Sequence, residues 1–178
     1  MDRGYVCTLS ALVLKATRAH LFHAGDTRIC RLRGEDLERL TEDHRLWVSR
    51  DTSYLSRALG VGPHLELDHR SLALEPGDLF LLTTDGVHEH LPPSAMLALI
   101  QAHGADLDGA ARAIAEAAYQ RGSDDNLTVQ LVRIEQLPRA DAGELHQLLG
   151  ELPLPPLLQP RMEFDGYRIV RSLHASSR

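Results

Sequence analysis

The hydrophobic and polar positions along the chain predict a domain built mainly of strands, with two helices near its middle. Apolar runs of strand length, separated by turn residues, fill the first half of the chain. These runs predict strands at residues 5–14, 19–24, 27–32, 37–40, 65–74 and 79–84. The turn residues Gly25-Asp26 separate the second and third strands, as in a β-hairpin. Residues 41–63 show no regular period, and we expect a loop with some helical content there.

A helical pattern follows the last of these strands. Residues 93–103 form one apolar-faced segment, with Ser94 as the expected N-cap and Gly104 as the stop. Residues 107–121 form a second, alanine-rich helical segment. Strict alternation at residues 127–137 then predicts a further strand.

The composition changes after this strand. Five of the nine prolines fall between Pro138 and Pro160. Such a segment is typical of an extended linker. We therefore divide the chain into a domain at residues 1–137, a Pro-rich linker with one short helix at 138–163, and a separate segment at 164–178.

Composition and charge narrow the function classes. A net charge of −6 over 178 residues disfavours a nucleic-acid-binding surface. No apolar stretch reaches the roughly 18 residues of a membrane span, so we expect no membrane contact. Cys7 and Cys30 form no CxxC pair, lie in apolar runs and are interpreted as small buried residues. Two cysteines cannot form a disulfide scaffold, which favours a reducing, cytoplasmic location.

Acidic residues at two turns carry the strongest chemical signal. Asp85 ends a buried apolar strand and is followed by Gly86, and Asp125 lies in an Asp-Asp-Asn turn between a helix and a strand. Carboxylates held close together repel one another unless a cation lies between them. Mg²⁺ and Mn²⁺ prefer such oxygen ligands. Taken singly, both motifs are also ordinary turn formers.

The order of the motifs indicates a family. In sequence order they are HAGDTR (23–28), LTEDH (40–44), SRALG (56–60), GDLFLLTTDG (77–86) and GSDDNLTV (122–129). With these motifs at these spacings, residues 4–135 resemble the metal-dependent protein phosphatase 2C (PPM) family of serine/threonine phosphatases.

The resemblance implies an α+β fold, an antiparallel β-sandwich flanked by helices. It implies a two-metal centre at one end of the sandwich, with Mn²⁺ or Mg²⁺, that hydrolyses phosphoserine and phosphothreonine in proteins. The implied metal ligands are Asp85, Asp125 and, for a third and weaker ion, Asp26. Glu89 is an implied outer acid, and residues 41–63 overlap the family's mobile flap.

Two parts of the family pattern do not occur in this chain. These are an upstream Asp-Gly-x-Gly-Gly motif, whose aspartate bridges the metals, and an upstream arginine that holds phosphate. We therefore expect an N-terminally truncated catalytic domain that is inactive alone, with Arg28 and Arg57 as its remaining motif arginines. The alternative is a non-catalytic regulatory or phosphoprotein-binding module. A zinc site at His88-Glu89-His90, on an extended segment, is a further alternative.

The end of the chain carries a second resemblance. The segment FDGYRIVRSL (164–173) resembles the first strand of a protein-kinase domain, before its glycine-rich loop. This predicts a new strand from residue 164 to residue 170 and a bacterial protein in which a kinase domain follows the phosphatase. The alternative is a terminal segment with strand propensity only.

Overall fold

The computed structural model describes residues 5–49, 53–62, 64–138, 159, 161–164 and 167–170. The chain forms two compact units, residues 1–138 and residues 139–178. The first unit contains all of the candidate metal ligands, and the second contains the segment that resembles a kinase strand.

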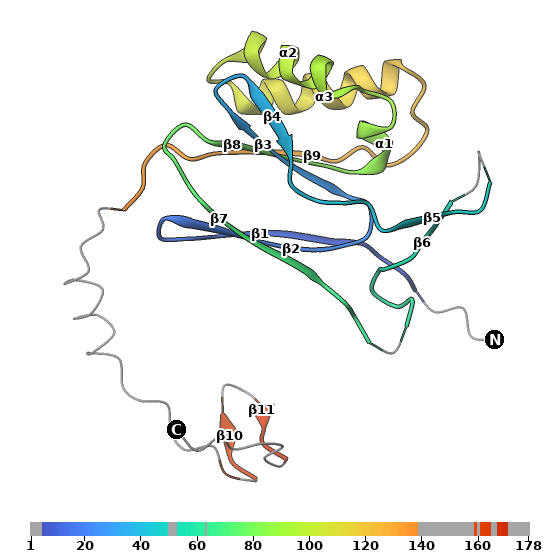
Figure 1. Cartoon of the computed structure of the whole chain (residues 1–178), viewed down its shortest axis with the longest axis vertical. Helices are drawn as coiled ribbons and strands as arrows, with labels where there is room; N and C mark the ends of the chain where they lie inside the picture. Colours follow the sequence, from blue (N-terminus) through green and yellow to red (C-terminus); the bar gives the residue numbers. More distant parts are fainter. Residues whose placement is uncertain are drawn as a thin grey trace. The chain divides into compact units, whose positions relative to one another are not determined.

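The first unit is a sandwich of two antiparallel sheets (Figure 1). One sheet has the order β1-β2-β7, with β1 at Leu9–Lys15, β2 at Arg18–Ala24 and β7 at Asp68–Ala73. The other has the order β4-β3-β8-β9, with β4 at Asp36–Arg39, β3 at Arg28–Arg33, β8 at Leu79–Thr83 and β9 at Val129–Arg133. The predicted antiparallel β-sandwich is confirmed.

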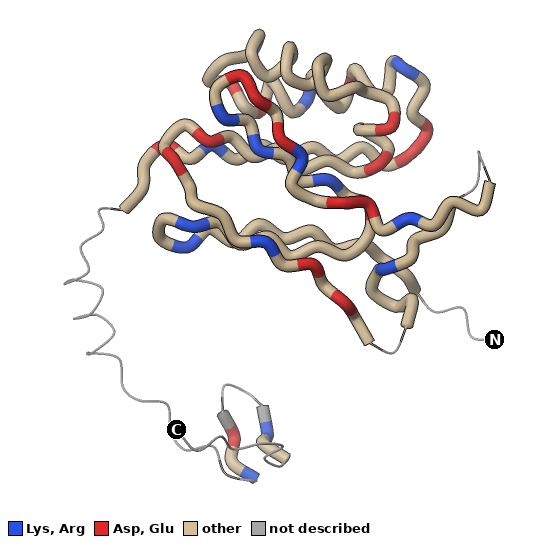
Figure 2. Tube along the Cα trace, in the orientation of Figure 1, with Lys and Arg blue, Asp and Glu red and all other residues tan. Residues whose placement is uncertain are grey.

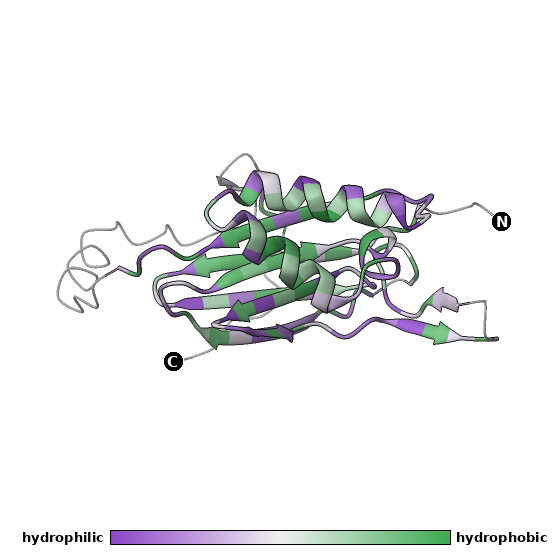
Figure 3. Cartoon of the chain, turned by 90° about the horizontal axis from the view of Figure 1, so that it is seen from above, coloured by the Kyte–Doolittle hydropathy of each residue, from purple (hydrophilic) through white to green (hydrophobic). Residues whose placement is uncertain are grey.

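Helices α2 (Pro93–His103) and α3 (Leu107–Gln120) cover the outer face of the four-stranded sheet, and the one-turn helix α1 (Asp85–His88) follows β8 (Figure 1). Both long helices lie where the sequence predicted them. Figure 3 shows mostly hydrophobic strands beneath helices that alternate hydrophobic and hydrophilic positions. Buried apolar residues fill this interface, among them Leu81, Val87, Ile100 and Ile114.

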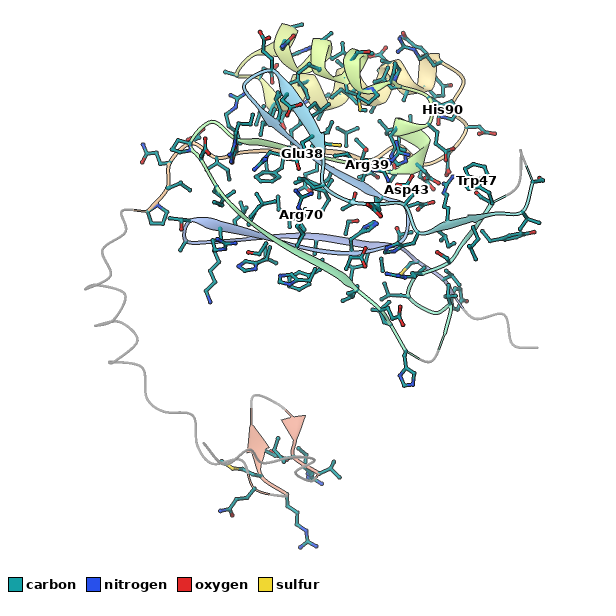
Figure 4. All side chains as sticks on the ribbon, in the orientation of Figure 1. Glu38, Arg39, Asp43, Trp47, Arg70 and His90 are labelled. Carbon is teal, nitrogen blue, oxygen red and sulfur yellow. The ribbon has the colours of Figure 1, made fainter. Side chains whose placement is uncertain are left out.

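A second core lies between the two sheets. It contains Leu21 of β2, Ile29 of β3 and Phe80 of β8, which are at most 2% exposed. The Arg70 guanidinium of β7 also reaches the Glu38 carboxylate of β4, at 2.7 Å, and links the edges of the two sheets (Figure 4).

The predicted hairpin between residues 19–24 and 27–32 is wrong. Strand β2 pairs with β1 and β7, whereas β3 pairs with β4 and β8. The two strands belong to different sheets because this arrangement buries the side chains of Leu21 and Ile29 in the shared apolar core between the sheets. Turn chemistry at Gly25-Asp26 therefore marks a crossing between sheets.

The helical content expected in residues 41–63 is also wrong for the part of this segment that the structure describes. It forms a short antiparallel pair, β5 (Arg45–Trp47) and β6 (Ser53–Leu55). The side chains of Leu46, Trp47 and Tyr54 are 63–65% exposed. A helix in this segment would have no buried apolar face to stabilise it. The segment forms a short antiparallel strand pair instead.

Two local predictions about single residues are wrong. The N-cap of α2 is Pro92 instead of Ser94, and no side chain caps the helix. Cys7 is exposed, whereas Cys30 is buried as predicted. Across the described residues, no helix combines the length and the apolar character needed to cross a membrane.

In the second unit, β10 (Glu163–Phe164) pairs antiparallel with β11 (Tyr167–Arg168). The single strand predicted from residue 164 to residue 170 is therefore wrong, because the chain reverses within it. The predicted short helix after residue 138 and nearly all of the Pro-rich linker lie outside the described residues.

Candidate metal centre

Asp26 lies in the crossing between β2 and β3, at one end of the sandwich. Gly25 adopts a φ of +121°, and a Cβ at this position would lie 2.4 Å from Thr8 Cγ2, so the crossing requires glycine. The backbone N–H of His44 donates to the Gly25 carbonyl at 2.7 Å, and the Gly25 N–H donates to His44 Nδ1 at 3.2 Å. These bonds hold Asp26, which is 7% exposed, beside the start of β5.

Asp85 and Glu89 lie at the two ends of α1. Asp85 is the first residue of this helix and Glu89 is its C-cap. The Glu89 N–H donates to the Asp85 carbonyl at 3.0 Å, which places both side chains one turn apart on the same short helix. Buried β8 fixes the position of this helix, because α1 begins two residues after that strand ends.

Arg45, the first residue of β5, brings these acids together. Its Nε donates to Asp26 Oδ2 at 2.6 Å and its Nη2 donates to Asp85 Oδ2 at 2.9 Å. Its Nη1 donates to Glu89 Oε1. We call Asp26, Asp85 and Glu89 the carboxylate cluster.

Charge in this cluster is unbalanced. Three carboxylates face one guanidinium, whose side chain is 15% exposed. Burial works against the charged form of Arg45, but its hydrogen bond to Asp26 and the charges of Asp26 and Glu89 outweigh burial and raise its pKa. Acidic positions also surround α1 and the loop after α3 in Figure 2. An uncompensated negative charge of this kind attracts cations.

Asp125 lies beside Gly86, the second residue of α1. A Cβ at Gly86 would lie 3.1 Å from Asp125 Cβ and 2.9 Å from the Asn126 carbonyl oxygen. Thr84 fixes the contact, because its Oγ1 donates to the Asn126 carbonyl and accepts from the Thr128 N–H, each at 3.0 Å. The loop of Asp125 is thus held against the helix that carries Asp85.

The donor set suits a hard divalent cation, because it consists of carboxylate oxygens from separate segments at one end of a sheet. Among the described residues, no group of three or more His, Cys, Asp or Glu side chains already forms a metal cage. The guanidinium of Arg45 lies between the oxygens of Asp26 and Asp85 instead. Of the predicted ligands, Asp26 and Asp85 share this partner, whereas Asp125 accepts from the N–H of Asn126 at 2.7 Å.

The sequence pattern did not predict a role for Arg45. The signal was an arginine directly after the LTEDH motif, but nothing local connects it to acids 19, 40 and 44 residues away. The two motif arginines, Arg28 and Arg57, form ion pairs outside the carboxylate cluster. Arg28 pairs with Asp43 at 2.7 Å, and Arg57 pairs with Asp68 at 2.8 Å.

The two histidines of the zinc alternative make internal contacts. His88 is 8% exposed, and its Nδ1 lies 3.3 Å from Thr83 Oγ1. Burial, with a smaller contribution from Arg28, lowers the pKa of His88 to about 4. His90 Nδ1 lies 3.1 Å from the Gly86 carbonyl oxygen. His88 ends a helix instead of lying on an extended segment, so the geometry assumed for a zinc site is absent here.

Comparisons with known proteins agree with the motifs. The family model for protein phosphatase 2C matches residues 3–131. Protein phosphatase PhpP of Streptococcus pneumoniae is 26% identical over 149 residues, which cover 75% of this chain and 60% of PhpP. Serine/threonine phosphatase stp of Listeria monocytogenes is 28% identical over 144 residues, which cover 72% of this chain and 57% of stp.

Solved structures give the same result. PppA of Pseudomonas aeruginosa aligns with a TM-score of 0.65 and 31% identity, over 71% of this chain and 56% of PppA. The serine/threonine phosphatase PstP of Mycobacterium tuberculosis aligns with a TM-score of 0.66 and 26% identity, over 72% of this chain and 60% of PstP. The chain thus spans about three fifths of the length of these relatives. It belongs to the protein phosphatase 2C (PPM) family of serine/threonine phosphatases.

Proposed function

We propose that this chain supplies Asp85, Asp125 and Asp26 as ligands for Mn²⁺ or Mg²⁺ in a phosphatase that hydrolyses phosphoserine and phosphothreonine in proteins. The observation that carries the proposal is the meeting of Asp26, Asp85 and Glu89 at one end of the sandwich, from elements far apart in sequence. The PstP catalytic domain, a structural relative at 25% identity with a TM-score of 0.66, is described in complex with two manganese ions.

The chemistry of the cluster supports this role. Bound divalent ions neutralise phosphate oxygens and lower the pKa of water toward neutrality. The chain's own contribution is positioning: the Gly25 crossing holds Asp26, α1 holds Asp85, and Thr84 holds the loop of Asp125.

Cellular location and domain organisation complete the proposal. We propose a cytoplasmic protein, supported by the two free cysteines, Cys7 and Cys30. The division at residues 1–137, 138–163 and 164–178, and a kinase domain after residue 164, stay predictions. The competing interpretation is a non-catalytic phosphoprotein-binding module. The following experiment distinguishes it from a phosphatase.

The test is phosphate release from a phosphothreonine peptide with Mn²⁺, using this 178-residue chain and a version of it extended upstream. We expect turnover by the extended version, loss of turnover when it carries Asp85→Asn or Asp125→Asn, and negligible turnover by the 178-residue chain. Unchanged turnover in Asp85→Asn rejects the ligand assignment. Phosphopeptide binding by the extended version without turnover favours the non-catalytic module.

A further inference from the structure

Within the part of the chain that the structure describes, Arg45 is the one arginine whose guanidinium pairs with three carboxylates. Its three guanidinium nitrogens each donate to a different carboxylate, from the β2–β3 crossing and from both ends of α1. Arg28, by comparison, forms a two-pronged pair with Asp43 alone. A guanidinium shared among three acids acts as their common counter-cation.

We infer that Arg45 is a built-in competitor of the divalent metal: its guanidinium occupies the carboxylate oxygens that the metal needs, and metal binding displaces it. This inference rests on the proposed role of Asp26 and Asp85 as metal ligands. It adds that the affinity of the site for metal is set by an arginine of the same chain.

Electrostatics requires the exchange. The contacts of Asp26 and Asp85 with Arg45 are made through Oδ2 at 2.6 and 2.9 Å, so the guanidinium occupies carboxylate oxygens that would hold a divalent cation. Two cations about 4 Å apart repel strongly at the effective dielectric near a protein surface. The metal and Arg45 therefore cannot share the cluster in the observed geometry.

The β5–β6 pair gives Arg45 room to leave. This pair consists of three residues on each side, and the side chains of Leu46, Trp47 and Tyr54 on it are largely exposed. Moving it away from the cluster therefore removes little apolar burial. Trp47, which lies at the end of the sandwich in Figure 4, is the only tryptophan in the sequence and is two residues from Arg45. Its fluorescence reports on displacement of this strand.

The test is a titration of the 178-residue chain with Mg²⁺, followed by calorimetry and by Trp47 fluorescence. Arg45→Gln removes the charge at similar length, and Arg45→Lys keeps the charge but loses the three-way geometry. Arg57→Gln is the matched control, since Arg57 pairs with Glu66 and Asp68 outside the cluster. We expect Mg²⁺ to bind about tenfold or more tightly to Arg45→Gln, a change of about 1.4 kcal/mol. Arg45→Lys should be intermediate, and Arg57→Gln unchanged.

Metal should also change Trp47 fluorescence in the wild-type chain and change it less in Arg45→Gln, where the contact is already lost. Metal affinity in Arg45→Gln and Arg45→Lys that equals or falls below the wild-type affinity overturns the inference. Adding Asp85→Asn separates the two proposals. If Asp85→Asn abolishes Mg²⁺ binding while both Arg45 variants bind as the wild type does, the ligand assignment stands and only the competition fails. If Mg²⁺ binding is absent from every variant, or persists unchanged in Asp85→Asn, both proposals fail.

Discussion

Gly86 and Asn126 approach so closely that a Cβ on Gly86 would lie 2.9 Å from the Asn126 carbonyl oxygen. This contact joins α1, which carries Asp85, to the loop that carries Asp125. Thr84 reinforces it with hydrogen bonds to the same loop. The glycine in the Thr-Asp-Gly motif is therefore required for packing of the two segments that carry Asp85 and Asp125.

Gly86→Ala should push the loop of Asp125 away from α1. Backbone atoms oppose the added methyl group, so we expect a loss of about 1–3 kcal/mol in the free energy of unfolding. Mg²⁺ affinity should fall as well, because Asp85 and Asp125 move apart. Urea denaturation and a Mg²⁺ titration measure the two effects. The control is Gly62→Ala, since a Cβ there would lie 3.9 Å from its nearest neighbour. Equal stability of both variants would contradict the packing argument.

Asp78→Ala should strongly lower the free energy of unfolding. The Asp78 side chain is 0% exposed and accepts from Arg33 Nε at 2.7 Å and Nη2 at 2.8 Å. Removing it leaves a guanidinium without its buried partner, and we expect a loss of about 3 kcal/mol in stability by chemical denaturation. Glu75→Ala is the matched control, because Glu75 pairs with the same arginine while 62% exposed, and should cost less than about 1 kcal/mol.

The Asp78 carboxyl group should also make the stability of the fold decrease at low pH. Burial raises the pKa of Asp78, but the hydrogen bonds from Arg33 and from the Glu75 N–H outweigh burial, so its pKa lies below the usual 3.8. Its contribution is therefore complete above pH 3.8 and is lost as the pH falls through the lower folded-state value.

His88 predicts a second pH dependence at milder pH. Its pKa falls from 6.5 to about 4, chiefly through burial, so the unfolded chain binds the proton more readily than the folded chain. Stability should accordingly fall as the pH drops from about 6.5 toward 4, by a total on the order of 3 kcal/mol. Thermal unfolding at pH 7 and pH 5 measures this. His88→Gln should flatten the dependence, whereas His64→Gln, at an exposed position, should leave it unchanged. An identical slope in His88→Gln would refute the assignment.

His44→Ala should loosen Asp26. His44 Nδ1 accepts from the Gly25 N–H, and its Nε2 lies 2.9 Å from Asp68 Oδ2, so the ring ties the β2–β3 crossing to β7. Removing the ring leaves a buried N–H without its partner, which costs about 1–3 kcal/mol. We also expect weaker Mg²⁺ binding, measured by calorimetry, because Asp26 loses its support. His20→Ala serves as the control, since His20 stacks on His69, away from this crossing.

Local sequence patterns were sufficient to predict much of the secondary structure. Helices α2 and α3 and strand β8 follow from short-range periodicity and from stop residues such as Gly104, because those signals act within a few residues. The ligand candidates Asp85 and Asp125 were recognisable for the same reason: each lies in a turn with glycine or asparagine beside a strand or a helix.

Tertiary structure decided the rest. Residues of β2 and β3 face one another across two sheets instead of pairing in one, because burying Leu21 and Ile29 in a shared core is more favourable than an isolated hairpin. No local pattern places Arg45 among Asp26, Asp85 and Glu89, since these residues meet only when the crossing, β5 and α1 reach the same end of the sandwich. Sequence alone therefore predicted the candidate acids, whereas long-range packing alone brings Arg45 to Asp26, Asp85 and Glu89.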